Sequence, residues 1–129
     1  MVAITTALAL VISINTSEII LRDNDVPVFV YKYADVPNKP YLKEWYTPNG
    51  VNVLRDAPHD HSHHHGMMYA LAFDGVNYWE EGNRGGYEVH QDISRVSVAP
   101  DAGALGVGFE EDLILHPPDS EEAVIKERR

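Results

Sequence analysis

The chain has 129 residues, no cysteine and a formal net charge of −10. This length suits one domain, in which roughly two-thirds of the unfolded surface is buried. The negative charge repels phosphate groups, so neither nucleic acid nor an anionic membrane surface is expected as a partner. The absence of cysteine excludes disulfides, so nitrogen and oxygen atoms must supply any metal ligands.

Residues 1–14 form the first apolar segment, which has two interpretations. It resembles the core of a secretion signal, although it has neither a basic leading segment nor a small-residue cleavage site. Alternatively, the β-branched residues Val11, Ile12 and Ile14 favour a first strand over Ala7–Ile14. No apolar run reaches the roughly 18 residues that span a bilayer, so the sequence predicts a soluble chain without a transmembrane segment.

The next elements are predicted from alternation and turn residues. Segments 18–22 and 26–33 are rich in β-branched and aromatic residues, and the polar residues 23–25 between them favour a tight turn. They predict a hairpin. Residues 34–50 carry three prolines and a glycine, which predicts a long ordered loop pinned by aromatic residues. Residues 51–55 predict a short strand.

Further strands are predicted beyond residue 66. The apolar run 67–73 is followed by Asp74-Gly75, the strongest hairpin signal in the chain, and by a return strand over residues 76–79. Residues 87–98 predict a long strand, and the alternation of Leu105, Val107 and Phe109 predicts another before residues 113–115. Convincing helices are absent. Short strands separated by turns predict an all-β fold, an antiparallel β-sandwich.

The last part of the chain is predicted as two turns and a strand. The acidic residues Glu110, Glu111 and Asp112 are interpreted as a solvated turn. Residues 116–119 form a second turn, and residues 123–128 predict a strand that ends without a partner. Because such a strand leaves an unpaired edge, residues 1–129 are interpreted as one β-sandwich domain or as the amino-terminal fragment of a longer, truncated one.

Five histidines lie within residues 59–65, and this density points to a working site. On an extended backbone, His61, His63 and His65 would share one face. If the backbone turns instead, His61 and His64 converge, with Asp60 orienting a ring. Three imidazoles suit a divalent metal such as zinc, and the candidate ligands are His61, His63 and His64. Whether a metal is bound stays open.

A second interpretation needs no metal. Sugar ring opening, epimerisation or elimination requires a proton donor and a proton acceptor across the substrate. The candidate acid–base groups are His61, His64, His90 and Glu80. Candidates for substrate contact are Arg55, Asp56, Asp60, Tyr78 and Trp79, with Lys39 as a further hydrogen-bond donor. Because Tyr78 and Trp79 alternate in a strand, one of them is expected in the core. The competing hypothesis is a non-catalytic module that binds glycan or metal.

Several motifs together resemble one known family. They are Lys39-Pro40-Tyr41, Tyr46-Thr47-Pro48-Asn49-Gly50, Val53-Leu54-Arg55-Asp56, Asp60-His61-Ser62-His63-His64-His65-Gly66, Tyr78-Trp79-Glu80 and His90. The chain resembles the bacterial PmoA-like family, labelled "methane oxygenase PmoA", over nearly its whole length. That family typically has proline and arginine where this chain has Ser62 and His65.

The resemblance implies a fold and a substrate class. Members of the PmoA-like family are soluble and longer than this chain, which supports the interpretation as an amino-terminal fragment. The implied fold is a sugar mutarotase-like β-sandwich, and the implied substrate is a small molecule or glycan. The location stays open: the secretion-signal interpretation of residues 1–14 would make the chain periplasmic or secreted in a bacterium, and the absence of cysteine leaves the compartment undecided.

Overall fold

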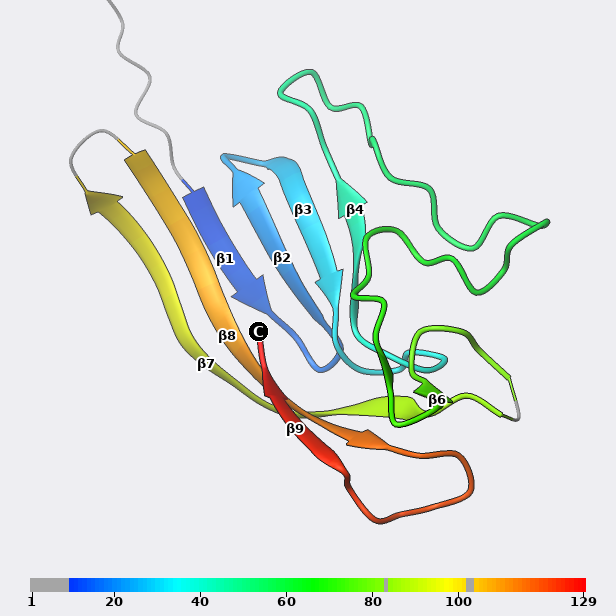
Figure 1. The fold of residues 1–129 in the computed structure, drawn as a ribbon. Helices are drawn as coiled ribbons and strands as arrows, with labels where there is room; N and C mark the ends of the chain where they lie inside the picture. Colours follow the sequence, from blue (N-terminus) through cyan, green and yellow to red (C-terminus); the bar gives the residue numbers. More distant parts are fainter. Residues whose placement is uncertain (1–9, 83, 102–103) are drawn as a thin grey trace, which may run out of the picture.

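A computed structural model describes residues 10–82, 84–101 and 104–129, and all regular elements among these residues are β-strands. One antiparallel sheet contains, in spatial order, β1 (Leu10–Ile14), β2 (Glu18–Asp23), β3 (Val26–Lys32) and β4 (Tyr41–Trp45) (Figure 1). A second antiparallel sheet contains β7 (Tyr87–Asp101), β8 (Ala104–His116) and β9 (Ile125–Arg128). A short hairpin joins β5 (Ala72–Phe73) to β6 (Val76–Asn77). The predicted all-β antiparallel class is confirmed.

Local turn chemistry explains why the hairpins form where they do. The side-chain oxygen of Asn15 accepts the amides of Ser17 and Glu18 at 2.9 and 2.8 Å, which turns the chain from β1 into β2. Asp74 and Gly75 have φ angles of 48° and 76°. Two successive positive φ angles match the twist of the flanking strands, and aspartate followed by glycine adopts them readily. The hairpins predicted from residues 23–25 and from Asp74-Gly75 are both confirmed.

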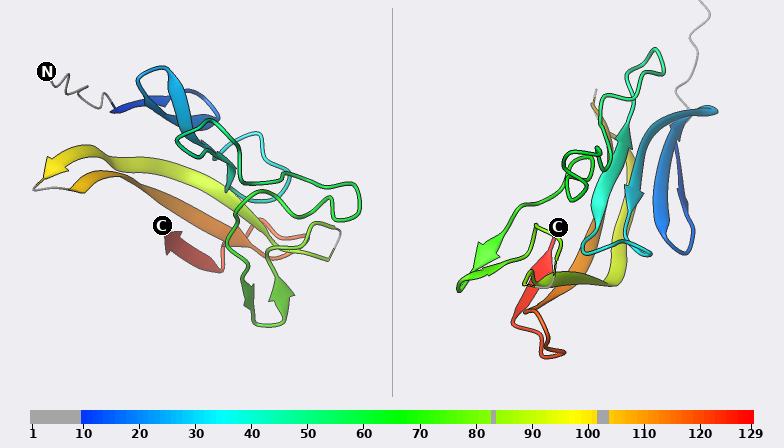
Figure 2. Two further views of the ribbon diagram at one scale, coloured as in Figure 1. Left: turned by 90° about the horizontal axis from the view of Figure 1, so that it is seen from above. Right: turned by 90° about the vertical axis from the view of Figure 1, so that its right-hand side faces the viewer.

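The two large sheets pack face to face, as the view from above shows (Figure 2). Ile19, Tyr31 and Tyr33 from the first sheet form a buried cluster, and Ile93 and Phe109 of the β7–β8 hairpin pack against it. Two antiparallel sheets that bury apolar side chains between them make the layered arrangement of a sandwich. The first hydrophobic core lies between these layers.

A second hydrophobic cluster uses the same long hairpin. Leu113 and Leu115 of β8 pack with Tyr78, which is 1% exposed. Gly86 permits this contact, because a Cβ there would lie 2.3 Å from Cε1 of Tyr78. The β7–β8 hairpin therefore supports the β1–β4 sheet at one cluster and the segment around Tyr78 at the other.

Three predictions about the middle of the chain are wrong. Residues 34–50 are not one long loop, because they contain β4, which pairs with β3. Residues 51–55 are not a strand: Asn52 forms one isolated bridge with Tyr46, and its side-chain oxygen accepts the amides of Trp45 and Leu54. The apolar run 67–73 is not a core strand, because three of its large side chains are exposed: Met67, Tyr69 and Phe73.

The end of the chain also differs from prediction. Glu111 is not in a solvated turn; it lies within β8 and is 0% exposed. The strand predicted over residues 123–128 is present as β9, but it has a partner, because it pairs with β8. At the other end, β1 covers the second half of the predicted strand 7–14, and residues 1–9 lie outside the described residues. Among the described residues, no helix has the length and apolarity needed to cross a membrane.

Candidate functional site

The histidine loop, residues 57–66, folds as two consecutive turns. The amide of His61 donates to the carbonyl of Pro58, and the amide of His64 donates to the carbonyl of His61, both at 2.9 Å. The amide of Ala57 donates to the carbonyl of His64 and closes the loop. The extended arrangement is therefore wrong, and the turned arrangement predicted as its alternative is correct.

Three imidazoles of the histidine loop gather beside Trp79. The rings of His61 and His64 stack at 4.9 Å, and the ring of His63 lies 5.7 Å from that of Trp79. Oδ2 of Asp60 lies 3.3 Å from Nδ1 of His61, as predicted for an orienting carboxylate. Partial loss of solvent and the neighbouring His63 and His61 lower the pKa of His64.

These imidazoles do not form a ready metal centre. In the part of the chain that the structure describes, no group of three or more histidine or acidic side chains is arranged to hold a metal ion. The rings of His61, His63 and His64 stack edge and face against each other, as packed aromatic groups do. The predicted metal ligands therefore lie together without being placed as a coordination set.

His65 differs from the other histidines of the loop because it is buried. Its Nδ1 lies 2.7 Å from Oδ1 of Asp56, and its Nε2 lies 2.6 Å from Oε1 of Glu81. Tyr41 packs its ring on His65 at 4.7 Å and donates its hydroxyl to Oδ2 of Asp56 at 3.2 Å. Each nitrogen of the His65 ring therefore faces a carboxylate oxygen, and the two contacts fix the orientation of the ring. His65 thus links the histidine loop to Glu81.

Asn77 shapes the turn that carries Trp79, Glu80 and Glu81. Its side-chain oxygen accepts the amides of Trp79 and Glu80 at 2.9 and 3.0 Å, and its Nδ2 donates to Oε2 of Glu80 at 3.1 Å. Glu80 and Glu81 line a pocket of about 290 Å³ together with Asn77, Gly82, Arg84 and Gly85. Glu81 is therefore the group that connects this pocket to the buried His65.

Lys39 is a buried cation near the same turn. Its side chain is 1% exposed, and its Nζ has no hydrogen-bond partner among the described residues. Burial lowers the pKa of Lys39, while the negative charges of Glu81 and Glu88 act in the opposite direction. Lys39 therefore balances the charge of two acidic residues without a direct bond to either.

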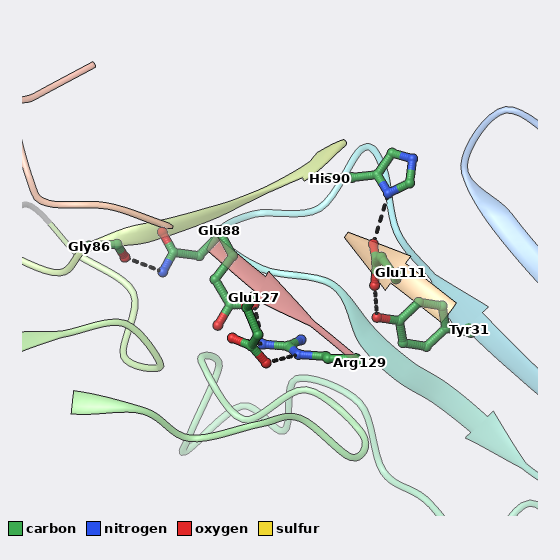
Figure 3. Close-up of polar contacts among 8 residues, drawn as sticks. Tyr31, Gly86, Glu88, His90, Glu111, Glu127 and Arg129 are labelled. Carbon is green, nitrogen blue, oxygen red and sulfur yellow. Dashed lines mark hydrogen bonds and ion pairs between the residues drawn. The ribbon is translucent and has the colours of Figure 1, made fainter. Parts of the chain in front are cut away.

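Glu88 of β7 is held by Arg129. Nη2 of Arg129 lies 2.7 Å from Oε2 of Glu88, and Nε of Arg129 lies 2.7 Å from Oε1 of Glu127 (Figure 3). Burial raises the pKa of Glu88 from 4.5 to about 7, and the charge of Arg129 acts against this rise. Glu88 therefore changes its charge near neutral pH.

His90 is oriented by the buried Glu111. Nδ1 of His90 lies 2.9 Å from Oε1 of Glu111, and the hydroxyl of Tyr31 donates to Oε2 of the same carboxylate (Figure 3). Burial raises the pKa of Glu111 and also that of Tyr31. The ring of Tyr33 packs on His90 at 4.5 Å. The sequence predicts Glu80 as the carboxylate partner of His90. In the structure, the carboxylate partner of His90 is Glu111.

The structure brings together most of the predicted site residues, but not all of them. Those that meet at the histidine loop and the 77–81 turn are Asp56, Asp60, His61, His63, His64, Trp79 and Glu80. Arg55 is exposed and makes no ion pair within the described ranges. Tyr78 is a core residue and offers no surface to a substrate, so the expectation that one of Tyr78 and Trp79 is core holds.

The buried polar groups were not predicted from the sequence. They are His65 and Tyr41 beside Asp56, Glu81 at the pocket, Glu88 and Glu111 on the long hairpin, and Tyr31 opposite Glu111. One signal was present, because Glu111 precedes Leu113 and Leu115 at a spacing of two and so shares their buried face.

Residues 18–129 match a protein family that is described as a family of unknown function, DUF6807. The chain belongs to this family. Comparison with curated proteins and with solved structures gives no match. The range matched by DUF6807 includes the whole histidine loop, the pocket residues Glu80 and Glu81, and the buried acids Glu88 and Glu111.

The raised pKa of Glu88 predicts a pH-dependent stability. A carboxyl whose pKa is higher in the folded state stabilises the fold below pH 4.5, and this contribution is lost as the pH rises through about 7. Glu88→Gln cannot ionise, so its free energy of unfolding relative to the parent should rise by about 3 kcal/mol between pH 4.5 and 8. Urea unfolding at several pH values measures this difference. For the exposed Glu122→Gln, the difference from the parent should stay constant, and a constant difference for Glu88→Gln would contradict the prediction.

Proposed function

We propose that this member of DUF6807 processes carbohydrate by His/Glu acid–base chemistry at the pocket lined by Glu80 and Glu81. The observation that carries the proposal is the position of His65, which lies between Asp56 and Glu81 while Glu81 lines the pocket. A carboxyl group hydrogen-bonded to an imidazole can exchange a proton with it directly rather than with water. This is the property that sugar chemistry at neutral pH needs.

The simplest reaction of this kind is the opening of a sugar ring. A base removes the proton of the anomeric hydroxyl, an acid gives a proton to the ring oxygen, the bond between C1 and the ring oxygen breaks, and a carbonyl forms. Glu81, coupled to His65, and Glu80, held by Asn77, provide two carboxyl groups in different surroundings. One carboxyl group would act as the acid and the other as the base. Epimerisation and elimination need the same pair of groups.

Trp79 provides the surface on which a sugar ring would lie. The indole is half-buried beside the imidazoles of His63 and His64, at 5.7 and 6.1 Å, and its neighbour in the chain is Glu80. Aromatic rings of this kind bury the apolar face of a ligand while nearby polar groups fix its orientation. The PmoA-like resemblance, its mutarotase-like fold and a periplasmic or secreted location in a bacterium fit the same proposal.

The second candidate function is a non-catalytic module that binds glycan or metal. The exposed imidazole cluster on Trp79 favours it, because these rings are solvent-accessible and their ring contacts are with one another and with Trp79. A binding module needs this surface but does not need the buried relay through His65. The two functions therefore share Trp79, but only the enzyme depends on Glu81 and its contact with His65.

Glu81→Gln separates these two functions. For the enzyme, we expect the variant to lose about a hundredfold in the rate of anomer interconversion, because the amide cannot exchange a proton with His65. The measurement is NMR exchange spectroscopy on glucose, galactose and mannose, with and without protein. Glu122→Gln, an exposed acid remote in sequence from the turn, is the matched control and should keep the parent rate.

Two other outcomes decide against the enzyme. Sugar binding that Trp79→Ala weakens, in a parent protein that never accelerates anomer interconversion, elimination or epimerisation, would establish the module. A parent protein that binds neither sugar nor metal would refute both candidate functions.

A further inference from the structure

A second pocket adjoins the one that contains Glu80 and Glu81. It has a volume of about 470 Å³ and shares Gly82 and Gly85 with the first pocket, whose volume is about 290 Å³. Binding sites for small molecules start at about 300 Å³, so the two pockets are comparable to sites for one small unit each. Because they share two residues, one ligand can extend from the first into the second.

The walls of the second pocket are held in place. The ring of Tyr87 lies flat on that of His116, at 4.9 Å and an interplanar angle of 13°, and its hydroxyl donates to the carbonyl of Ser120 at 3.1 Å. Asn38 donates from its side chain to the carbonyl of Gly86, and its own carbonyl accepts the amide of Glu88, both at 2.8 Å. A pocket with fixed walls loses little entropy when a ligand enters.

Asp119 gives the second pocket a polar group that is not used by the protein. It lines the pocket, is exposed, and makes no hydrogen bond or ion pair with its side chain among the described residues. Its φ angle is 58°, a left-handed conformation that aspartate adopts more readily than most residues.

The charges of the two pockets favour one class of sugar. Four acidic residues line them: Glu80, Glu81, Glu88 and Asp119. Glu88 is paired with Arg129, and Arg84 is the basic residue among the described lining residues. The whole chain carries a net charge of −10. An acidic sugar would be repelled, whereas hydroxyl groups donate readily to carboxylates.

We infer that the substrate is an uncharged oligosaccharide of at least two sugar units, with one unit beside Glu81 and the next beside Tyr87 and Asp119. This inference rests on the proposed function and adds the size and charge of the substrate. The second pocket raises affinity by binding a unit that does not react. Longer ligands then bind more tightly than single sugars, because the second contact is intramolecular.

Calorimetric titration tests the inference with defined sugars. The probes are neutral gluco-, manno- and galacto-oligosaccharides of one to four units, and oligogalacturonates of the same lengths. We expect the tightest ligand to be neutral and to bind at least tenfold more tightly as a dimer than as a monomer. In Asp119→Gly, glycine adopts the left-handed backbone conformation without strain. We expect this variant to bind the dimer about tenfold more weakly than the parent and to bind the monomer with the parent affinity.

The control is Asn24→Gly. Asn24 is also exposed, has a φ angle of 53° and lies in the turn between β2 and β3, outside both pockets. Equal affinity for monomer and dimer, tighter binding of an acidic oligomer, or an Asp119→Gly variant with the parent affinity for the dimer would overturn the inference while the proposed function stands. If no sugar on the panel binds, the proposed function fails and the inference fails with it.

Discussion

Replacing Glu111 by alanine lowers the free energy of unfolding by about 3–5 kcal/mol. Glu111 is 0% exposed, and its two oxygens hold Nδ1 of His90 and the hydroxyl of Tyr31. Without the carboxyl group, the buried hydroxyl of Tyr31 and the partly buried His90 lose their partner, and the space of the removed side chain stays empty between the sheets. Urea unfolding at pH 7 measures the loss.

The neighbouring residue provides the control for this prediction. Glu110 also lies in β8, but it pairs with the exposed Arg95 at 3.1 Å. Surface ion pairs contribute at most about 1 kcal/mol, so Glu110→Ala should stay within about 1 kcal/mol of the parent. Similar losses in Glu110→Ala and Glu111→Ala would show that Glu111 is not the buried centre of the network.

Replacing Gly66 by alanine is expected to cost more than about 3 kcal/mol. A Cβ at Gly66 would lie 2.1 Å from the carbonyl oxygen of Leu42 and 3.2 Å from Cα of Lys43, and its φ angle is +29°. The obstructing atoms are backbone atoms of Leu42 and Lys43 in β4, so no side-chain rotation relieves the clash. The substitution must break the bridge between Leu42 and Met67 and displace the adjacent His65.

Thermal unfolding and the NMR signals of His65 measure the effect of Gly66→Ala. We expect a lower melting temperature and loss of the contacts from His65 to Asp56 and Glu81. Gly108 in β8 is the matched control, because a Cβ there meets nothing within 4 Å. If Gly66→Ala proved as stable as Gly108→Ala, the path of the histidine loop across β4 would be refuted.

Elements fixed by local chemistry could be predicted from the sequence. The hairpin around residues 23–25 and the one at Asp74-Gly75 follow from turn residues between β-forming segments. The strand β8 follows from the period of two in Leu105, Val107 and Phe109. β4 was missed, because the prolines on either side of residues 41–45 suggested a continuous loop. Between these prolines, the five residues of β4 pair with β3.

The buried site could not be predicted, because its partners are distant in sequence. Glu111 and Tyr31 are 80 residues apart, and neither residue alone indicates that an acid will be buried. The crowded histidines draw attention to the loop that contains His65. What separates His65 from its neighbours is the pair of carboxylates at Asp56 and Glu81, 9 and 16 residues away, and spacing along the chain does not reveal such a pair.

The β7–β8 hairpin forms the floor of two separate cores, one under the β1–β4 sheet and one under Tyr78. Each core contains residues of the β7–β8 hairpin, so unfolding of one core removes packing from the other. We therefore expect the described part of the chain to unfold as a single cooperative unit. A change in the bend of this hairpin shifts residues in both cores. Substitutions among Ile19, Tyr31 and Tyr33 can therefore change the geometry of the pocket beside Tyr87, even though these side chains do not line it.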